Sequence, residues 1–226
     1  MSPGAVQQGL YVCKYLLAQM TTKAREHGGP SGTRDRIIGA ALEVFAEKGF
    51  SGSTTKEIAR RAKVNEVTVF RQFRSKRALF GAVVAERSPM IPIMERVSLD
   101  PRGSMDELLL GNVRIVLKML RSNRHLFYIM MGDAWRQPRI RSLAYNASIK
   151  KGLEFVAAMM QGLMDAGKMR RMDPMIPARA LMGAVQFYFL TTEILGEGSP
   201  EPQEEEKVVR GFVSIFLDGM RQDREG

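Results

Sequence analysis

The feature that most constrains this chain is the stretch from Thr54 to Lys76, TTKEIARRAKVNEVTVFRQFRSK. Thr54 followed by Glu57 predicts a helix N-cap with a capping box. The residues 63–65 interrupt the helical pattern and predict a tight turn. Asn65 is expected to cap the next helix, because its side-chain oxygen can accept from free N–H groups in the first turn. The stretch therefore predicts two short helices joined by a turn.

The second of these helices has two different faces. Val69 and Phe73 are four residues apart and would anchor one face on a core. The other side carries side chains that can form hydrogen bonds with base edges or phosphates, namely Glu66, Thr68, Arg71 and Gln72. A helix-turn-helix of this shape places its second helix in the DNA major groove. The pattern therefore favours a DNA partner.

The stretch lies in a longer block that resembles the DNA-binding domain of the TetR family of bacterial transcription regulators. The block begins at Thr33 and contains RDRIIGAALEVFAEKGFSGSTTKEIA, AKVNEVTVFRQF and SKRALFGAV, with every spacer of the expected length. Two positions depart from the family. Lys63 stands where the family usually has Gly, and Phe70 stands where it often has Tyr. A non-Gly residue in this turn would need a left-handed backbone, at a cost of about 1 kcal/mol or more.

The resemblance implies a homodimer that reads a palindromic operator, most often a repressor released by a small molecule. The residues that it places at the DNA are Thr54, Thr55, Lys56, Asn65, Glu66, Val67, Thr68, Phe70, Arg71, Gln72 and Lys76. It also implies that the last two helices of each subunit form a four-helix bundle. The expected dimer contacts are Val185, Phe189, Val209, Phe212, Val213 and Phe216. The alternative for these apolar residues is a place in the core of a single chain.

The charge of the chain agrees with a polyanionic partner. The formal net charge is +10, and residues 33–87 hold twelve Lys and Arg against six Asp and Glu. The basic excess thus lies on the helix-turn-helix block. Cys13 is the single cysteine, and His27 and His125 are the two histidines, so neither a disulfide framework nor a metal site is expected. No cofactor is expected, and the composition is compatible with a reducing cytoplasm.

Apolar residues at helical spacing predict an all-α fold. We expect a flexible extension over residues 1–32, a DNA-binding domain over 33–87, and a helical regulatory and dimerisation domain over 88–226. The apolar run Leu10–Met20 is too short to span a bilayer, and no Lys or Arg precedes it to form a signal peptide. A membrane partner is therefore not expected.

Helix boundaries follow from caps and breakers. Thr33 is expected to cap the first helix and Gly49 to end it, while the fourth helix should start at Ser75 or Lys76. The later helices are expected at about 105–121, 123–131, 138–167, 173–195 and 208–220.

A ligand pocket is expected in the middle of the C-terminal domain. Its candidate lining is apolar and rich in Met, a residue suited to adaptable surfaces. The candidates are Met119, Phe127, Met130, Met131, Trp135, Tyr145, Phe155, Met159 and Phe187. For each of them, a plain core position is the competing interpretation. A helical enzyme and a membrane-surface or protein-interaction module are the alternative functions, but no nucleophile–base pair, metal cluster or phosphate loop supports the enzyme.

Overall fold

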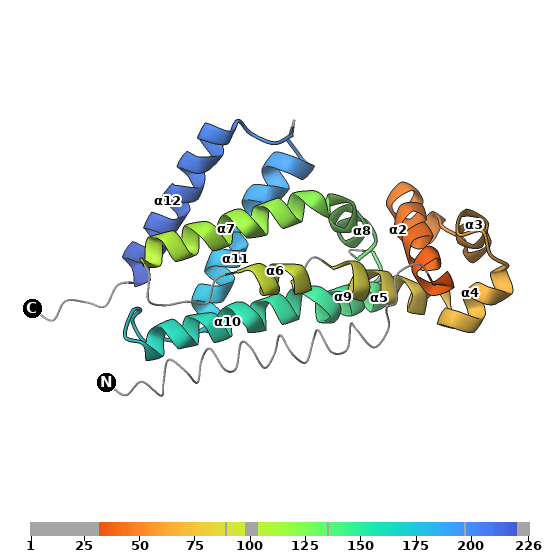
Figure 1. The fold of residues 1–226 in the computed structure, drawn as a ribbon, viewed down its shortest axis with the longest axis horizontal. Coiled ribbons are helices and arrows are strands. Elements are labelled where there is room, and N and C mark those ends of the chain that lie inside the picture. Colours follow the sequence, from red (N-terminus) through yellow and green to blue (C-terminus); the bar gives the residue numbers. More distant parts are fainter. Residues whose placement is uncertain (1–31, 89, 98–103, 135, 197, 221–226) are drawn as a thin grey trace, which may run out of the picture. The chain divides into compact units, whose positions relative to one another are not determined.

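The structure, a computed structural model, describes residues 32–88, 90–97, 104–134, 136–196 and 198–220, without the side chains of 90–92, 130–134 and 147. Within these ranges every regular element is a helix, as expected for an all-α chain (Figure 1). In this part of the chain, no helix combines the length and apolar character that a membrane crossing needs. The expected extension lies outside the described residues except for Gly32.

The helices group into two compact units. Among the described residues, one unit contains 32–90 and 123–151, and the other contains 91–122 and 152–220. The division expected from the sequence did not place residues 123–151 with the N-terminal helices. The reason is packing, because Leu126, Ile129 and Ile140 are buried in the same core as the N-terminal helices.

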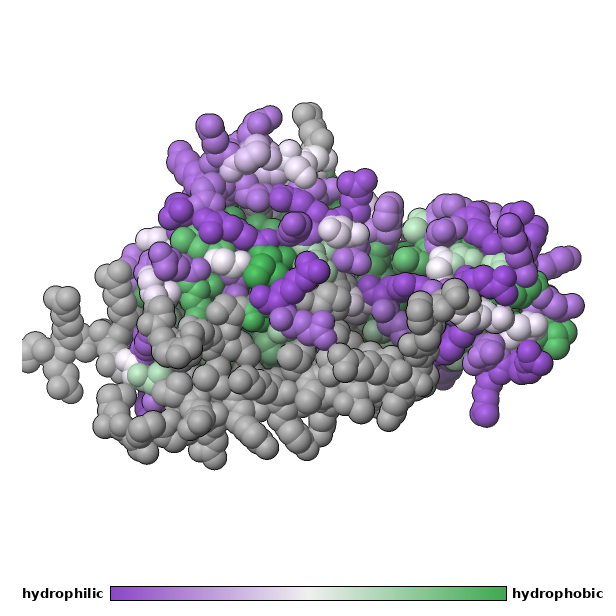
Figure 2. Space-filling view, viewed as in Figure 1, coloured by the Kyte–Doolittle hydropathy of each residue, from purple (hydrophilic) through white to green (hydrophobic). Residues whose placement is uncertain are grey.

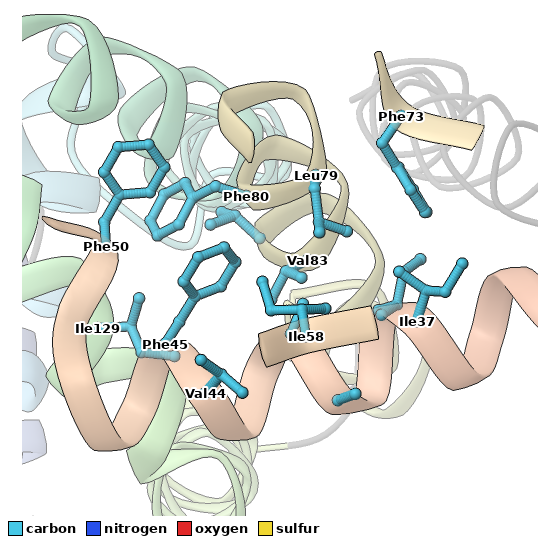
Figure 3. Packing of buried hydrophobic residues seen from close by; sticks show 14 of the residues in the cluster. Ile37, Val44, Phe45, Phe50, Ile58, Phe73, Leu79, Phe80, Val83 and Ile129 are labelled. Atoms are coloured by element: carbon cyan, nitrogen blue, oxygen red, sulfur yellow. The ribbon is translucent and has the colours of Figure 1, made fainter. Parts of the chain in front are cut away.

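The first unit, called here the N-terminal unit, has six α-helices and one π-helix among its described residues. They are α2 (Thr33–Gly52), α3 (Thr55–Arg61), α4 (Glu66–Phe73), α5 (Lys76–Arg87), α8 (Arg124–Ala134), α9 (Pro138–Ala144) and the π-helix η1 (Tyr145–Ile149). Three aromatic rings join α2 to α5 at the centre of the core (Figure 3). The ring centroids of Phe45 and Phe80 lie 5.3 Å apart, and those of Phe50 and Phe80 also lie 5.3 Å apart, both edge to face. This packing fixes the base on which α3 and α4 sit.

The ends of α2 differ from the expected ends. The helix includes Thr33, and its N-cap is Gly32, which has no side chain to accept from the first turn. Thr33 was therefore wrongly expected to be the cap. Gly49 has φ 67°, a left-handed conformation that glycine adopts without strain, and it kinks the helix. One further turn follows the kink and ends at Gly52.

The second unit, called here the C-terminal unit, also has helices as its regular elements within its described residues. Its elements are α6 (Met90–Arg96), α7 (Met105–Ser122), α10 (Lys150–Asp165), α11 (Met175–Phe189), the π-helix η2 (Leu190–Ile194) and α12 (Pro202–Met220). Arg121 of α7 links two of the others, since its guanidinium contacts Glu193 of η2 at 2.6 Å and also Glu205 of α12. The hydrogen bonds that Arg121 donates to Glu205 and to Glu193 raise the pKa of Arg121 against the effect of burial. The charged cluster therefore holds α12 and η2 on α7.

Candidate nucleic-acid interface

The start of α3 is built as the sequence predicts. The Thr54 side chain accepts a hydrogen bond from the backbone N–H of Glu57 at 3.1 Å. The Glu57 carboxylate does not complete a reciprocal capping box, because it pairs with Lys48 Nζ at 2.6 Å. Thr54 and Lys56 are exposed at this helix end. The first turn of α3 therefore places an exposed lysine beside a helix N-terminus, an arrangement that favours a phosphate.

The turn between α3 and α4 contains the predicted left-handed residue. Lys63 has φ 54°, and the next N–H, that of Val64, donates back to the carbonyl of Ala59 at 3.0 Å. This is the usual backbone pattern by which a left-handed residue ends a helix. Lys63 carries a Cβ where glycine would avoid the steric cost, so the turn is strained in the way its sequence indicates.

The recognition helix candidate, α4, is capped and anchored from within its own sequence. Asn65 Oδ1 accepts from the backbone N–H of Val67 at 2.9 Å, which confirms the predicted N-cap. Val69 and Phe73 are buried on one face, as their spacing predicts. The opposite face is left for a partner.

Glu66 has a partner inside the unit. Thr55 Oγ1 of α3 donates to Glu66 Oε1 of α4 at 2.6 Å, and both residues are half-buried. Glu66 was expected among the residues that contact DNA. The hydrogen bond gives it a structural role, because it ties the first turn of α4 to the first turn of α3.

Lys76 has a different environment from the one expected of a phosphate contact. Its Nζ donates to the backbone carbonyls of Phe50 at 2.7 Å and Ser53 at 2.8 Å, and lies 4.5 Å from the centre of the Phe50 ring. These acceptors belong to the last turn of α2 and the connection to α3. The ammonium group therefore gives carbonyls at the end of α2 a charged donor, and the Phe50 carbonyl also accepts from Ser53 Oγ at 2.8 Å.

The outward face of α4 combines exposed apolar and cationic side chains. Val67 is 72% exposed and Phe70 46% exposed. Arg71 and Gln72 are exposed beside them, and Thr68 is half-buried. Arg74, the left-handed residue that ends α4, is exposed as well, although it was not among the expected contacts. Its position two turns beyond Val67 and one turn beyond Phe70 is the sequence signal that could have identified it.

Ion pairing separates the cations of the N-terminal unit into two groups. Arg34, Lys48, Arg61 and Arg87 pair with carboxylates of the same unit. The hydrogen bond from Arg61 holds the pKa of the Glu47 carboxyl below its ordinary value. No ion pair within the described ranges involves the exposed cations Lys56, Arg60, Lys63, Arg71, Arg74 and Arg77. Figure 2 shows mainly hydrophilic side chains over α2, α3 and α4, with apolar atoms between them.

The expected dimer contacts are mostly interior. Four of the six are buried within the single chain, namely Val185, Phe189, Val209 and Val213. Phe212 and Phe216 are half-buried, and the Phe212 ring meets the Tyr188 ring edge to face with centroids 5.9 Å apart. The large apolar residues exposed on α11 and α12 are instead Ile176, Phe187 and Ile215. The sequence identifies an apolar face on each of these two helices. In the structure, both apolar faces pack on the core of the same chain.

The expected pocket residues are distributed over both units. Phe155 and Met159 are buried in α10, and Met119 is half-buried in α7, all in the C-terminal unit. Phe127 and Tyr145 belong to the N-terminal unit. Phe187 is 66% exposed, which does not fit the wall of an internal pocket. Trp135 and the side chains of Met130 and Met131 lie outside the described residues.

Comparison with known proteins identifies both parts of the chain. Residues 37–83 match the family described as bacterial regulatory proteins, tetR family. Residues 109–219 match the C-terminal domain of AefR-like transcriptional repressors. The HTH-type transcriptional regulator YvkB of Bacillus subtilis is 27% identical over 200 residues, which cover 84% of this chain and 98% of YvkB.

Solved structures share the fold. A TetR family transcriptional regulator from Pseudomonas syringae superposes with a TM-score of 0.69 at 24% identity, over 83% of this chain and 96% of that one. The flavonoid-responsive regulator FrrA superposes with a TM-score of 0.70 at 22% identity, over 84% of this chain and 98% of FrrA. The family matches and the likeness to YvkB favour a regulator over the helical enzyme and the membrane-surface module. The chain therefore belongs to the TetR family of bacterial transcription regulators, which bind operator DNA as dimers and respond to small-molecule effectors.

Proposed function

We propose that this regulator is a cytoplasmic repressor that binds a palindromic operator through α3 and α4 and leaves it when a small apolar ligand binds. The observation that carries the proposal is the outward face of α4, where Arg71 and Arg74 stay unpaired while Glu66 is held by Thr55. Each phosphate that a cation neutralises contributes about −0.9 to the slope of log K against log salt. The unpaired cations therefore supply affinity, and the side chains of α4 supply base preference.

The dimer would form through the exposed faces of α11 and α12. Phe187 is 66% exposed on α11, and Ile215 is 74% exposed on α12. Gly183 and Gly211 lie on the same faces, and an added Cβ at either would meet no described atom within 4 Å beyond the neighbouring residues and backbone of its own helix. Small residues beside large apolar ones let two helices approach closely. This face, defined by Phe187, Ile215 and the two glycines, is called the outer face of α11 and α12 below.

The ligand site is proposed for the interior of the C-terminal unit. Phe155, Met159 and Met160 are buried in α10, and Met side chains can rearrange around different apolar molecules. Asn112 of α7 is buried beside them, and its Nδ2 donates to Met159 Sδ at 3.8 Å. Sulfur is a weak acceptor, so a ligand carbonyl or hydroxyl would be a better partner for this amide. An apolar site with one orienting amide fits a small, largely apolar effector.

Coupling between ligand and DNA is proposed to pass through α5. At the first residue of α5, Lys76 Nζ donates hydrogen bonds to the carbonyls of Phe50 and Ser53 and so holds this end of the helix. Beyond its other end, Ser88 Oγ and Ser148 Oγ share a buried hydrogen bond of 2.9 Å. Ser148 lies in η1, whose helical run continues as α10. A displacement of α10 by ligand would therefore reach α5 through this serine pair.

Selection of bound sequences from a random DNA pool tests the proposal. A palindrome should be enriched, with half-sites about 34 Å or a multiple of it apart, as two major grooves on one side of the duplex demand. A panel of apolar small molecules is then screened for thermal stabilisation of the protein. For a ligand found in this way, operator DNA must weaken ligand binding by the factor by which the ligand weakens DNA binding, typically about 5- to 150-fold. Equal ligand affinity with and without operator would contradict release by ligand.

A further inference from the structure

Val67 has an unusual position for an apolar side chain. It lies in the first turn of α4 and is 72% exposed. Single exposed apolar residues are common on protein surfaces and need no partner. Val67, however, lies on the helix face that is proposed to enter the major groove, where docking would remove it from water. Its branched side chain is restricted at χ1 in a helix, so it presents two methyl groups in a fixed direction.

The polar groups around Val67 are used inside the protein. Asn65 Oδ1 accepts from the backbone N–H of Val67 at 2.9 Å. Glu66 Oε1 accepts from Thr55 Oγ1 at 2.6 Å. One side-chain oxygen of each residue is therefore engaged in holding the helix. Between these two residues and the arginines further along α4, Val67 offers the bases an apolar surface.

We propose that Val67 is a specificity-determining residue that contacts the C5-methyl group of a thymine in each operator half-site; the inference rests on the proposed function. The thymine methyl is the apolar group that base edges display in the major groove. Contact between it and Val67 removes apolar surface of both from water. A cytosine at this position offers its polar amino group to a side chain that cannot accept from it.

Arg71 places this thymine relative to a second base. It lies four residues after Val67 on the same face, so the two side chains start about 6 Å apart along the helix. That distance corresponds to about two base-pair steps of 3.4 Å. Arginine in the major groove most often contacts guanine. The half-site should therefore contain a thymine within about two base pairs of the guanine that Arg71 contacts.

Replacement of thymine by deoxyuridine tests the contact, because uracil pairs as thymine does but lacks the methyl group. The operator is the sequence that the wild-type protein selects, and each thymine of both half-sites is replaced in turn. Affinities are measured by fluorescence anisotropy at one salt concentration. At one symmetric position, uracil should weaken binding by about fourfold in each half-site, as loss of one buried methyl group predicts.

Protein variants assign that effect to Val67. Val67→Ala should bind the thymine and uracil operators equally, whereas Val67→Ile should keep the preference for thymine. Lys56→Ala is the control, since Lys56 is an exposed cation of α3 and its loss should weaken both operators by the same factor. If Val67→Ala keeps the full preference, or if the wild-type protein has none, the inference is wrong although the selected operator still binds. If the pool yields no enriched sequence, the proposed function itself fails.

Discussion

The helices α4 and α12 expose apolar side chains to almost the same extent, yet their surroundings differ in charge. Val67 is 72% exposed on α4, and Ile215 is 74% exposed on α12. Residues 66–77 contain one acidic and four basic residues, whereas residues 202–220 contain four acidic and two basic ones. Exposure alone therefore does not identify a partner. The charge of the neighbouring residues identifies it, because a basic surface attracts a polyanion. The surroundings of Val67 are basic, whereas those of Ile215 are not.

In both helices, carboxylates bind partners within the same unit. Glu66 is held by Thr55, and on α12 Glu205 contacts Arg121 while Glu206 contacts Arg114. What remains unpaired is different in the two cases. On α4 the unpaired groups include Arg71 and Arg74, and on α12 the outward residue Ile215 is apolar. The comparison thus supports the proposal that α4 binds DNA and that the outer face of α11 and α12 binds a second copy of the chain.

The largest effect should come from a charge placed on the outer face of α11 and α12. Ile215→Glu would bury a carboxylate of each protomer in an apolar interface, where unpaired charge costs several kcal/mol. The dimer should dissociate at concentrations at which the wild-type protein is dimeric, measured by analytical ultracentrifugation. Operator affinity should fall with it, because a monomer reaches one half-site only.

Ser214→Glu is the matched control for this experiment. Ser214 is also exposed on α12, but it lies on a different face from Ile215. In a helix of 3.6 residues per turn, the two side chains point about 100° apart around the axis. This variant adds the same charge and should remain dimeric. If Ile215→Glu dimerises with the same dissociation constant as the wild-type protein, this face is not the dimer interface.

The second effect concerns Lys76 and separates a structural cation from a DNA contact. Lys76→Met keeps most of the apolar stem but leaves the carbonyls of Phe50 and Ser53 without their charged donor, at a cost of about 1–3 kcal/mol in the free energy of unfolding. Urea unfolding measures this loss. The slope of log K against log salt should not change. Arg77→Met, which removes an exposed cation with no ion pair in the described structure, should leave stability unchanged.

The opposite result would restore the interpretation drawn from the resemblance. If Lys76→Met flattens the salt slope by about one unit without loss of stability, the ammonium group neutralises a phosphate.

What the sequence predicts well in this chain is local. The caps Thr54, Asn65 and Ser75 each accept from a backbone N–H within three residues, and the pattern of the chain places them. Apolar residues at helical spacing predicted the all-α fold. The family resemblance added the left-handed turn at Lys63, where the family usually has Gly, and the role of α4.

Contacts between distant segments could not be predicted in this way. Lys76 is 26 residues from Phe50, whose carbonyl it binds, and Thr55 is 11 residues from Glu66. The sequence also could not predict which surface the apolar faces of α11 and α12 pack against. A period of 3.6 residues identifies an apolar face but does not say whether the face packs on the same chain or on a second copy. Val185 and Phe189 were assigned to the dimer for that reason and are buried in the chain.

A third, smaller effect tests the strain in the turn before α4. Lys63→Gly removes the Cβ from a residue at φ 54°, whereas Lys63→Ala keeps it, and both remove the charge. The Gly variant should therefore be more stable than the Ala variant by about 1 kcal/mol, measured by urea unfolding. Gly also increases the entropy of the unfolded chain, which opposes this gain. An Ala variant as stable as the Gly variant would show that the turn relaxes without glycine.

The smallest effect compares surface ion pairs of the two units through their pH dependence. A hydrogen bond from Arg61 lowers the pKa of Glu47 in the N-terminal unit, and one from Arg114 lowers the pKa of Glu206 on α12. A carboxyl whose pKa is lowered by folding stabilises the protein above its unfolded pKa and loses this contribution as pH falls through the folded value. Glu47→Gln and Glu206→Gln should each be slightly less stable than the wild-type protein at pH 7. The difference should shrink between about pH 5 and pH 3, where the wild-type carboxyls become protonated. Urea unfolding at both ends of this range measures it. Since both pairs are exposed, the two variants should behave alike. If one variant remains less stable than the wild-type protein at low pH, its carboxylate does more than pair with its arginine.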